Sequence, residues 1–299
     1  MIGSCLQGYR ILEKIKDGSV GTVWRARDAG GRIVAIKQLA LRYAGVRARR
    51  RLFRREAEIT ARVRHRNVIR VYEYVNALPQ PFFVMEYFES ENLKYAMMRL
   101  PERVEGKEFA ILAQVARALE CVHARGILHR DIKPENVLVS ASSEARLIDF
   151  SLALTRLGRW LRFRRKVEGT PTYMSPEQVL GRAGDERSDI YSFGVLAYEL
   201  LAKRPPFAAG STEALLEKHL REAPPPMRTH IPTIAPDLDR FVLSLLAKDP
   251  ARRPPHMAVV VSELGRWERK DTVARRRQAA RRPRTELLQR PVELASTSL

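Results

Sequence analysis

The stretch from His129 to Val139 has the sequence HRDIKPENVLV. A short polar run comes first and three apolar residues follow at once, a pattern typical of a loop that opens into a buried strand. Such a loop holds its polar groups at the edge of a core. Asp131, Lys133 and Asn136 lie two and three residues apart, so a single loop can bring a carboxylate, an amine and a carboxamide to one small centre. The sequence therefore predicts a polar site built by this loop.

These residue types fit the demands of phosphoryl transfer. A carboxylate can orient a hydroxyl and accept its proton, and cations are needed where negative charge develops. We expect Asp131 to be the base and Lys133 to neutralise the transferred group. Asn136 offers an oxygen ligand of the kind that Mg²⁺ prefers. A polar turn rich in proline and asparagine is the alternative, and the order of the other motifs along the chain argues against it.

The loop resembles the catalytic loop of the eukaryotic-type (Hanks-type) protein kinases, and Lys133-Pro134-Glu135-Asn136 is similar to the serine/threonine branch. The resemblance implies an α+β fold with two lobes: a small antiparallel-sheet N-lobe with one helix, and a larger, mainly α-helical C-lobe. We expect the kinase domain over residues 1–268, with the N-lobe at about 9–88 and the C-lobe at about 89–268. A basic tail, either disordered or loosely helical, would follow over 269–299. Compact bacterial kinases are the most similar members.

A glycine-containing turn near the N-terminus is the first expected nucleotide motif. Gly18 and Gly21 flank small residues between strand-like segments, which allows the backbone to approach phosphate oxygens closely. A hairpin turn would show the same pattern. The family has a further glycine where this chain has Lys16. The lysine either adds a cation near the nucleotide or restricts the loop.

The next motif is Val34-Ala35-Ile36-Lys37, which has the pattern of a buried strand ending in an amine. By resemblance, Lys37 binds the α- and β-phosphates of ATP and is positioned by an ion pair with Glu56. Glu56 lies in the helical segment 47–62. Glu58 is a competing candidate on a different face of that helix.

The resemblance also assigns an adenosine pocket. Met85 would limit its depth, backbone groups of Glu86 and Phe88 would hydrogen-bond adenine, and Asn92 would reach a ribose hydroxyl. The complete set of expected ATP contacts is Ile15, Gly18, Gly21, Val23, Ala35, Lys37, Met85, Glu86, Phe88, Asn92 and Leu138.

A second metal ligand is expected thirteen residues after Asn136. Arg146-Leu147-Ile148-Asp149 has the pattern of a strand that ends in a carboxylate. Asp149 and Asn136 would hold Mg²⁺, or Mn²⁺ in its place, on the phosphates of ATP. Ser151 stands where the family has glycine, which disfavours positive φ there. We expect this segment to change conformation less readily than in relatives.

The segment between Thr155 and Thr170 contains no serine, threonine or tyrosine and is strongly basic from Arg156 to Lys166. Relatives that are activated by phosphorylation need an acceptor here to pair with the residue equivalent to Arg130. The sequence therefore predicts activity independent of that modification, with Glu168 as a candidate partner of Arg130. The basic run favours acidic protein substrates or partners, or RNA, and a solvated loop remains an equal alternative.

Three further assignments follow from the resemblance. Thr170 would hydrogen-bond Asp131 and Lys133, as in kinases that act on serine and threonine. Glu177 would pair with Arg253 and close the large lobe. Asp189 would cap the apolar helix that follows it and brace the backbone of the catalytic loop.

Net charge and hydropathy limit the partners and the cellular location that the chain can have. The formal net charge of +20 favours acidic proteins, nucleic acid or anionic membrane surfaces as partners. Nothing in the basic tail favours nucleic acid or anionic surfaces over a solvated chain. No stretch approaches the roughly twenty apolar residues of a membrane span, and the start lacks a signal-peptide pattern, so a cytoplasmic location is expected. Two rival functions are a poorly catalytic kinase-like scaffold, favoured by Lys16 and Ser151, and a small-molecule kinase, which Thr170 argues against.

Overall fold

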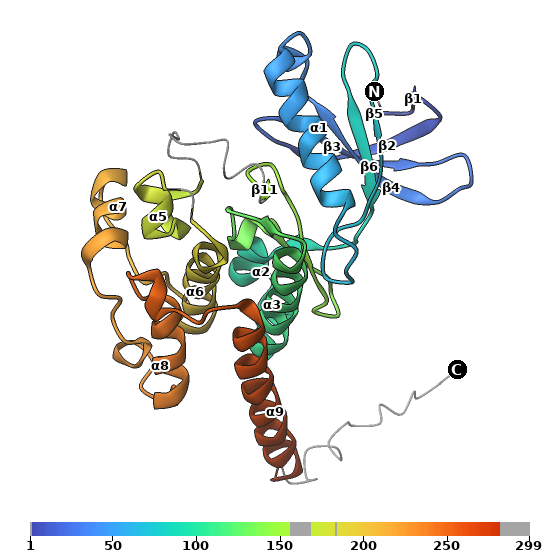
Figure 1. The fold of residues 1–299 in the computed structure, drawn as a ribbon. Coiled ribbons are helices and arrows are strands. Elements are labelled where there is room, and N and C mark those ends of the chain that lie inside the picture. Colours follow the sequence, from blue (N-terminus) through green and yellow to red (C-terminus); the bar gives the residue numbers. More distant parts are fainter. Residues whose placement is uncertain (1, 156–168, 183, 282–299) are drawn as a thin grey trace, which may run out of the picture.

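A computed structural model describes residues 2–155, 169–182 and 184–281, with 271–281 described as helix backbone. An antiparallel sheet with one long helix forms one end of the molecule, and a group of helices forms the other (Figure 1). The two-lobed α+β architecture expected from the sequence is confirmed. No helix in the described ranges combines the length and apolar character needed to cross a membrane.

The N-lobe is built on a six-stranded antiparallel sheet in the order β1-β2-β3-β4-β6-β5. Strands β4 and β6 are apolar at consecutive positions and are buried on both faces, and the apolar face of α1 covers one of these faces. Phe53 and Ala57 of α1 pack on Leu39, Val71 and Phe83 of the sheet. The elements are β1 (Cys5–Leu6), β2 (Tyr9–Asp17), β3 (Gly21–Arg27), β4 (Ile33–Leu39), the 3₁₀ turn η1 (Leu41–Tyr43), α1 (Arg47–Ala61), β5 (Val71–Val75) and β6 (Phe82–Glu86).

The C-lobe is organised around α3 and α6, whose side chains are buried on most sides. Gly194 allows α6 to approach α8 closely, because a Cβ at this position would lie 2.7 Å from the Cβ of Leu245. The helices are α2 (Leu93–Arg99), α3 (Glu108–Ala124), α5 (Pro176–Val179), α6 (Glu186–Ala202), α7 (Thr212–Arg221), α8 (Pro236–Leu245) and α9 (Met257–Arg281).

Short strands and 3₁₀ turns connect these helices and carry the loops at the junction of the lobes. β9 pairs with β10 and β7, and β11 pairs with β8. The strands are β7 (Glu91–Asn92), β8 (Ile127–Leu128), β9 (Val137–Val139), β10 (Ala145–Leu147) and β11 (Leu154–Thr155). The turns are η2 (Pro101–Arg103), η3 (Pro134–Asn136), η4 (Pro171–Tyr173), η5 (Met227–Thr229) and η6 (Pro250–Arg252).

One expectation about a helix end is wrong. Asp185, and not Asp189, caps α6: its side chain accepts a hydrogen bond from the backbone N–H of Arg187. Helix α9 packs along α3 and continues to Arg281 (Figure 1), so residues 269–281 take the helical one of the two states expected for the tail. Arginine, alanine and glutamine have high helix propensity, and this lets the helix run on with few apolar residues. Residues 282–299 lie outside the described part of the chain.

Candidate active site

The backbone of the catalytic loop is held by a buried carboxylate from α6. Asp189 accepts hydrogen bonds from the backbone N–H groups of His129 and Arg130, each at 2.8 Å, and its Oδ2 lies 2.8 Å from His123 Nε2. Burial raises the pKa of Asp189, but the hydrogen bond from His123 and the other donors outweigh burial and hold it below its usual range. The expected bracing role of Asp189 is therefore present in the structure, although it does not cap the helix.

The polar side chains of the loop converge as the spacing suggested. Lys133 Nζ lies 2.7 Å from Asp131 Oδ2 and 2.6 Å from Thr170 Oγ1, and Thr170 Oγ1 lies 3.4 Å from Asp131 Oδ1. Asn136 Nδ2 donates to Oδ2 of Asp131 at 2.9 Å and to its backbone carbonyl at 2.8 Å. Both contacts use the nitrogen of Asn136, which leaves its side-chain oxygen free to bind a cation.

An ion pair joins the sheet to α1 across the cavity. Lys37 Nζ lies 2.5 Å from Glu56 Oε1, as expected, whereas Glu58 pairs with Arg54 on the exposed face. Burial raises the pKa of Glu56 to about 7, although Lys37 opposes this. Burial lowers the pKa of Lys37, but Glu56 and Asp149 outweigh burial and raise it to about 12. Between these two pH values both partners are charged.

Asp149 is set up as an ionised ligand. Its backbone has φ of 64°, and its Oδ1 accepts a hydrogen bond from the backbone N–H of Ser151 at 3.1 Å. Burial raises its pKa, but Lys37 and the bonds from Ser151 outweigh burial and lower it to about 2. Ser151 does not adopt positive φ, as expected, and the positive φ falls on Asp149 instead. The neighbouring Phe150 is buried against His129, and the centroids of the two rings lie 4.7 Å apart.

The donor set fits a magnesium ion carried by a nucleotide. Among the described residues, no group of three or more His, Cys, Asp or Glu side chains is placed to hold a metal alone. Asp149 and Asn136 both line the same cavity and supply two oxygen ligands. Mg²⁺ commonly takes one or two protein oxygens and completes its shell with phosphates and water.

A cavity of about 620 Å³ lies between the sheet and the catalytic loop. It is lined by every residue that we expected to contact ATP, namely Ile15, Gly18, Gly21, Val23, Ala35, Lys37, Met85, Glu86, Phe88, Asn92 and Leu138. Lys133, Glu56 and Thr170 also line it. Sequence reasoning missed Val71 and Ile148, although the alternation in β5 and the position just before Asp149 could have indicated them.

Asn92 caps a helix, in addition to the ribose contact that we expect from it. It is the N-cap of α2, and its Oδ1 accepts a hydrogen bond from the backbone N–H of Tyr95 at 3.0 Å. The proposed ribose contact remains a prediction. The candidate partner of Arg130, Glu168, and the basic run 156–166 lie outside the described residues.

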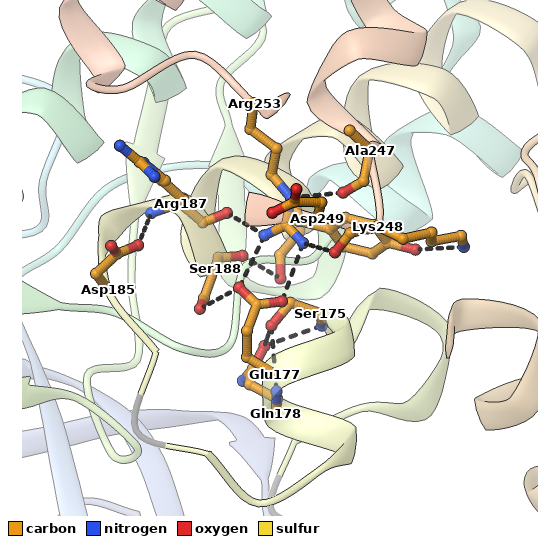
Figure 2. A network of polar contacts seen from close by, with 12 residues as sticks. Ser175, Glu177, Gln178, Asp185, Arg187, Ser188, Ala247, Lys248, Asp249 and Arg253 are labelled. Carbon is orange, nitrogen blue, oxygen red and sulfur yellow. Dashed lines mark hydrogen bonds and ion pairs between the residues drawn. The ribbon is translucent and has the colours of Figure 1, made fainter. Parts of the chain in front are cut away.

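A buried ion pair within the large lobe joins α5 to the residue that follows η6. The guanidinium of Arg253 bonds both carboxylate oxygens of Glu177, at 2.8 and 2.9 Å (Figure 2). It also donates to the carbonyls of Arg187, Ala247 and Lys248. The expected pairing of Glu177 with Arg253 is present.

The segment that ends at α5 is fastened to α6 as well. Ser192 Oγ donates to the carbonyl of Tyr173 at 2.7 Å, and Tyr173 Oη donates to Glu199 at 2.6 Å. Glu199 also pairs with Lys94 of α2 at 2.6 Å. Gln178 donates to the carbonyl of Arg130 at 2.8 Å, so this segment and the catalytic loop are directly joined.

Comparison with known proteins extends over most of the chain. The family described as Protein kinase domain matches residues 9–264. The probable serine/threonine-protein kinase SCO3848 of Streptomyces coelicolor is 38% identical over 256 residues, which cover 82% of this chain and 37% of that protein. Serine/threonine-protein kinase pkn3 of Myxococcus xanthus is 35% identical over 86% of this chain and 49% of its own length.

Solved structures show a similar likeness. The PknI kinase domain of Mycobacterium tuberculosis superposes with a TM-score of 0.69 at 26% identity, covering 89% of this chain and 98% of that domain. The chain spans about a third to a half of the length of the first curated relatives that it matches.

Proposed function

This chain belongs to the protein kinase family, and we propose that it is a serine/threonine protein kinase that transfers the γ-phosphoryl group of ATP to hydroxyls of protein substrates. One observation carries the proposal: Lys133, Thr170, the Lys37–Glu56 pair and Asp149 line one cavity, and Asp131 contacts Lys133 and Thr170 at its edge. Phosphoryl transfer is catalysed mainly by positioning and charge stabilisation, and these groups supply both.

Each side chain has a role that follows from its contacts. Asp131 orients the substrate hydroxyl and takes its proton, and Lys133 beside it offsets the charge on the transferred group. Lys37, fixed by Glu56, holds the α- and β-phosphates. Asp149 and Asn136 would hold Mg²⁺ or Mn²⁺, which neutralises phosphate charge when bound. Thr170 fixes the geometry of the base and its lysine.

The deciding experiment is transfer of labelled γ-phosphate from ATP with Mg²⁺. Wild type, Asp131→Asn and the exposed-carboxylate control Asp237→Asn are each tested on themselves and on a generic basic protein. We expect label on serine or threonine that only Asp131→Asn abolishes. A wild type that binds nucleotide but transfers no phosphate to either acceptor would refute the proposal and favour the scaffold function.

We also propose that activity does not depend on phosphorylation between Thr155 and Thr170. The sequence offers no acceptor in between, and the hydroxyl of Thr170 is engaged by Lys133 at 2.6 Å. Treatment with a protein phosphatase should leave the initial rate unchanged, as should Thr172→Ala. A large activation that accompanies phosphate on Thr170 or Thr172, located by mass spectrometry, contradicts this proposal.

The preference for acidic substrates is a further proposal. It is supported by the run of basic residues from Arg156 to Lys166, which lies outside the described part of the chain, and by the net charge of +20. Peptides that differ only in acidic or neutral residues around one threonine test it. Equal kcat/KM values for the two peptides at low salt would exclude the preference.

A further inference from the structure

Lys16 occupies an irregular position in the β2–β3 hairpin above the cavity. Lys14 pairs with Trp24 and Lys16 pairs with Val23, so Ile15 is an extra residue and β2 carries a bulge here. In a regular strand, neighbouring side chains point to opposite faces, whereas a bulge re-aims them. Ile15 and Lys16, although adjacent, both line the cavity. The bulge therefore brings the lysine to the face on which the nucleotide would lie.

The acid nearest to Lys16 in sequence is already engaged. Asp17 has one carboxylate oxygen 2.6 Å from Lys14 Nζ and the other 2.8 Å from Thr22 Oγ1. Of the three lysines that line the described part of the cavity, Lys37 and Lys133 each have an acidic partner, whereas Lys16 forms no ion pair with any described residue. A positive charge is thus left at the cavity wall without a carboxylate to neutralise it.

The loop that follows Lys16 is held close to the sheet. The guanidinium of Arg42 in η1 donates to the carbonyl of Ser19, and the backbone N–H of Ala40 donates to the carbonyl of Val20 at 2.9 Å. Gly18 donates to the carbonyl of Gly21 at 2.9 Å within the turn. Lys16 lies between Ile15, which would cover the base, and Gly18, which begins the phosphate-binding turn. Its cross-strand partner Val23 also lines the cavity, in the part of the wall between the expected base and phosphate positions.

We propose that Lys16 is a phosphate-binding residue that makes this site selective for anionic nucleotides over the neutral nucleoside. Its ammonium contacts the α-phosphate end of the polyphosphate. The inference rests on the proposed nucleotide site, which it deepens by adding a side-chain cation at a position where the resemblance offers only glycine backbone. Because the lysine is exposed, screening limits the gain, and we expect it to contribute about three- to tenfold in affinity.

The test compares equilibrium binding of ATP, ADP and adenosine to wild type, Lys16→Gln, Lys16→Gly and Lys16→Arg. Arg27→Gln is the matched control, because it removes one exposed positive charge at the far end of β3, away from the cavity. Titration is done at low and at physiological salt, and with Mg²⁺ and without it. Thermal unfolding of each variant shows that the fold is kept.

We expect Lys16→Gln and Lys16→Gly to weaken ATP and ADP by about three- to tenfold at low salt while the Kd of adenosine stays unchanged. Lys16→Arg should restore binding, and Arg27→Gln should have no effect. An unchanged Kd for ATP in Lys16→Gln overturns the inference while leaving the nucleotide site intact. An equal loss for adenosine also overturns it, since the lysine would then act on the loop and not on phosphate. A wild type that binds none of the three ligands overturns the inference and the proposed function together.

Discussion

The buried ion pair between Glu177 and Arg253 is expected to contribute strongly to the stability of the large lobe, and a single substitution can test this. Replacing Glu177 by glutamine keeps the shape of the side chain and removes its charge. The side chain of Arg253 is completely buried and that of Glu177 is 10% exposed. The guanidinium would keep its three bonds to backbone carbonyls but would lose the carboxylate that it bonds directly (Figure 2).

Two estimates of the cost agree. Breaking a buried ion pair by removing one partner costs about 3–5 kcal/mol, because the other charge stays buried. Of the two charged hydrogen bonds, at 2.8 and 2.9 Å and about 1.5–3 kcal/mol each, glutamine replaces one by a weaker neutral bond, and at the other its N–H₂ group faces the N–H of Arg253. For a chain of this size, about 3–5 kcal/mol corresponds to a fall in Tm of about 6–20 °C.

The measurement is thermal and urea unfolding followed by circular dichroism, with Glu217→Gln as control. Glu217 makes the same kind of pair with Arg221 on the surface of α7, where both side chains are more than half exposed. The control should change the free energy of unfolding by about 0.5 kcal/mol or less. The double variant Glu177→Gln/Arg253→Met should cost less than the sum of the two single variants. Equal effects of Glu177→Gln and Glu217→Gln would refute the reasoning.

Three more outcomes follow from the site. The kcat/KM should fall as pH is lowered through about 7, because Glu56 then gains a proton and its ion pair with Lys37 is lost; Glu56→Gln should lack this step in its pH profile. Gly21→Ala should destabilise the fold by about 1–3 kcal/mol and raise the KM for ATP, because the new Cβ would lie 2.1 Å from the carbonyl oxygen of Gln38; unchanged thermal unfolding would contradict this. Asp189→Asn should lower kcat more than it raises KM, because the backbone N–H groups of the catalytic loop lose a charged acceptor; an unchanged kcat in steady-state assays would rule this out.

Local spacing was sufficient to predict the residues that act within one loop. Asp131, Lys133 and Asn136 lie together because they are at most five positions apart in one short loop, which keeps their side chains close in space. The choice of Glu56 came from the family resemblance. The helical repeat adds only that Glu58, two residues away, cannot share the face that meets Lys37. Where one element determines the geometry, sequence reasoning holds.

Features that depend on partners distant in the sequence were harder to predict. Asp185 and Asp189 are both plausible caps by type, and only the packing of the catalytic loop on α6 shows that Asp189 serves that loop instead. The length of α9 depends on helix propensity without an apolar pattern to mark it. The direction of Lys16 depends on a bulge, and no residue pattern in β2 predicts one.

Helix α6 meets three separate requirements along one side of its length. Asp189 holds the catalytic loop, Ser192 holds the carbonyl of Tyr173, and Glu199 joins Tyr173 to Lys94 of α2. These three residues are also buried, so a substitution at any of them disturbs packing and a hydrogen bond at once. In a library of random variants selected for activity, α6 should accept fewer changes per position than any exposed helix face. When copies of such a gene diverge, substitutions should therefore accumulate in the exposed loops, while the residues of α6 stay the same.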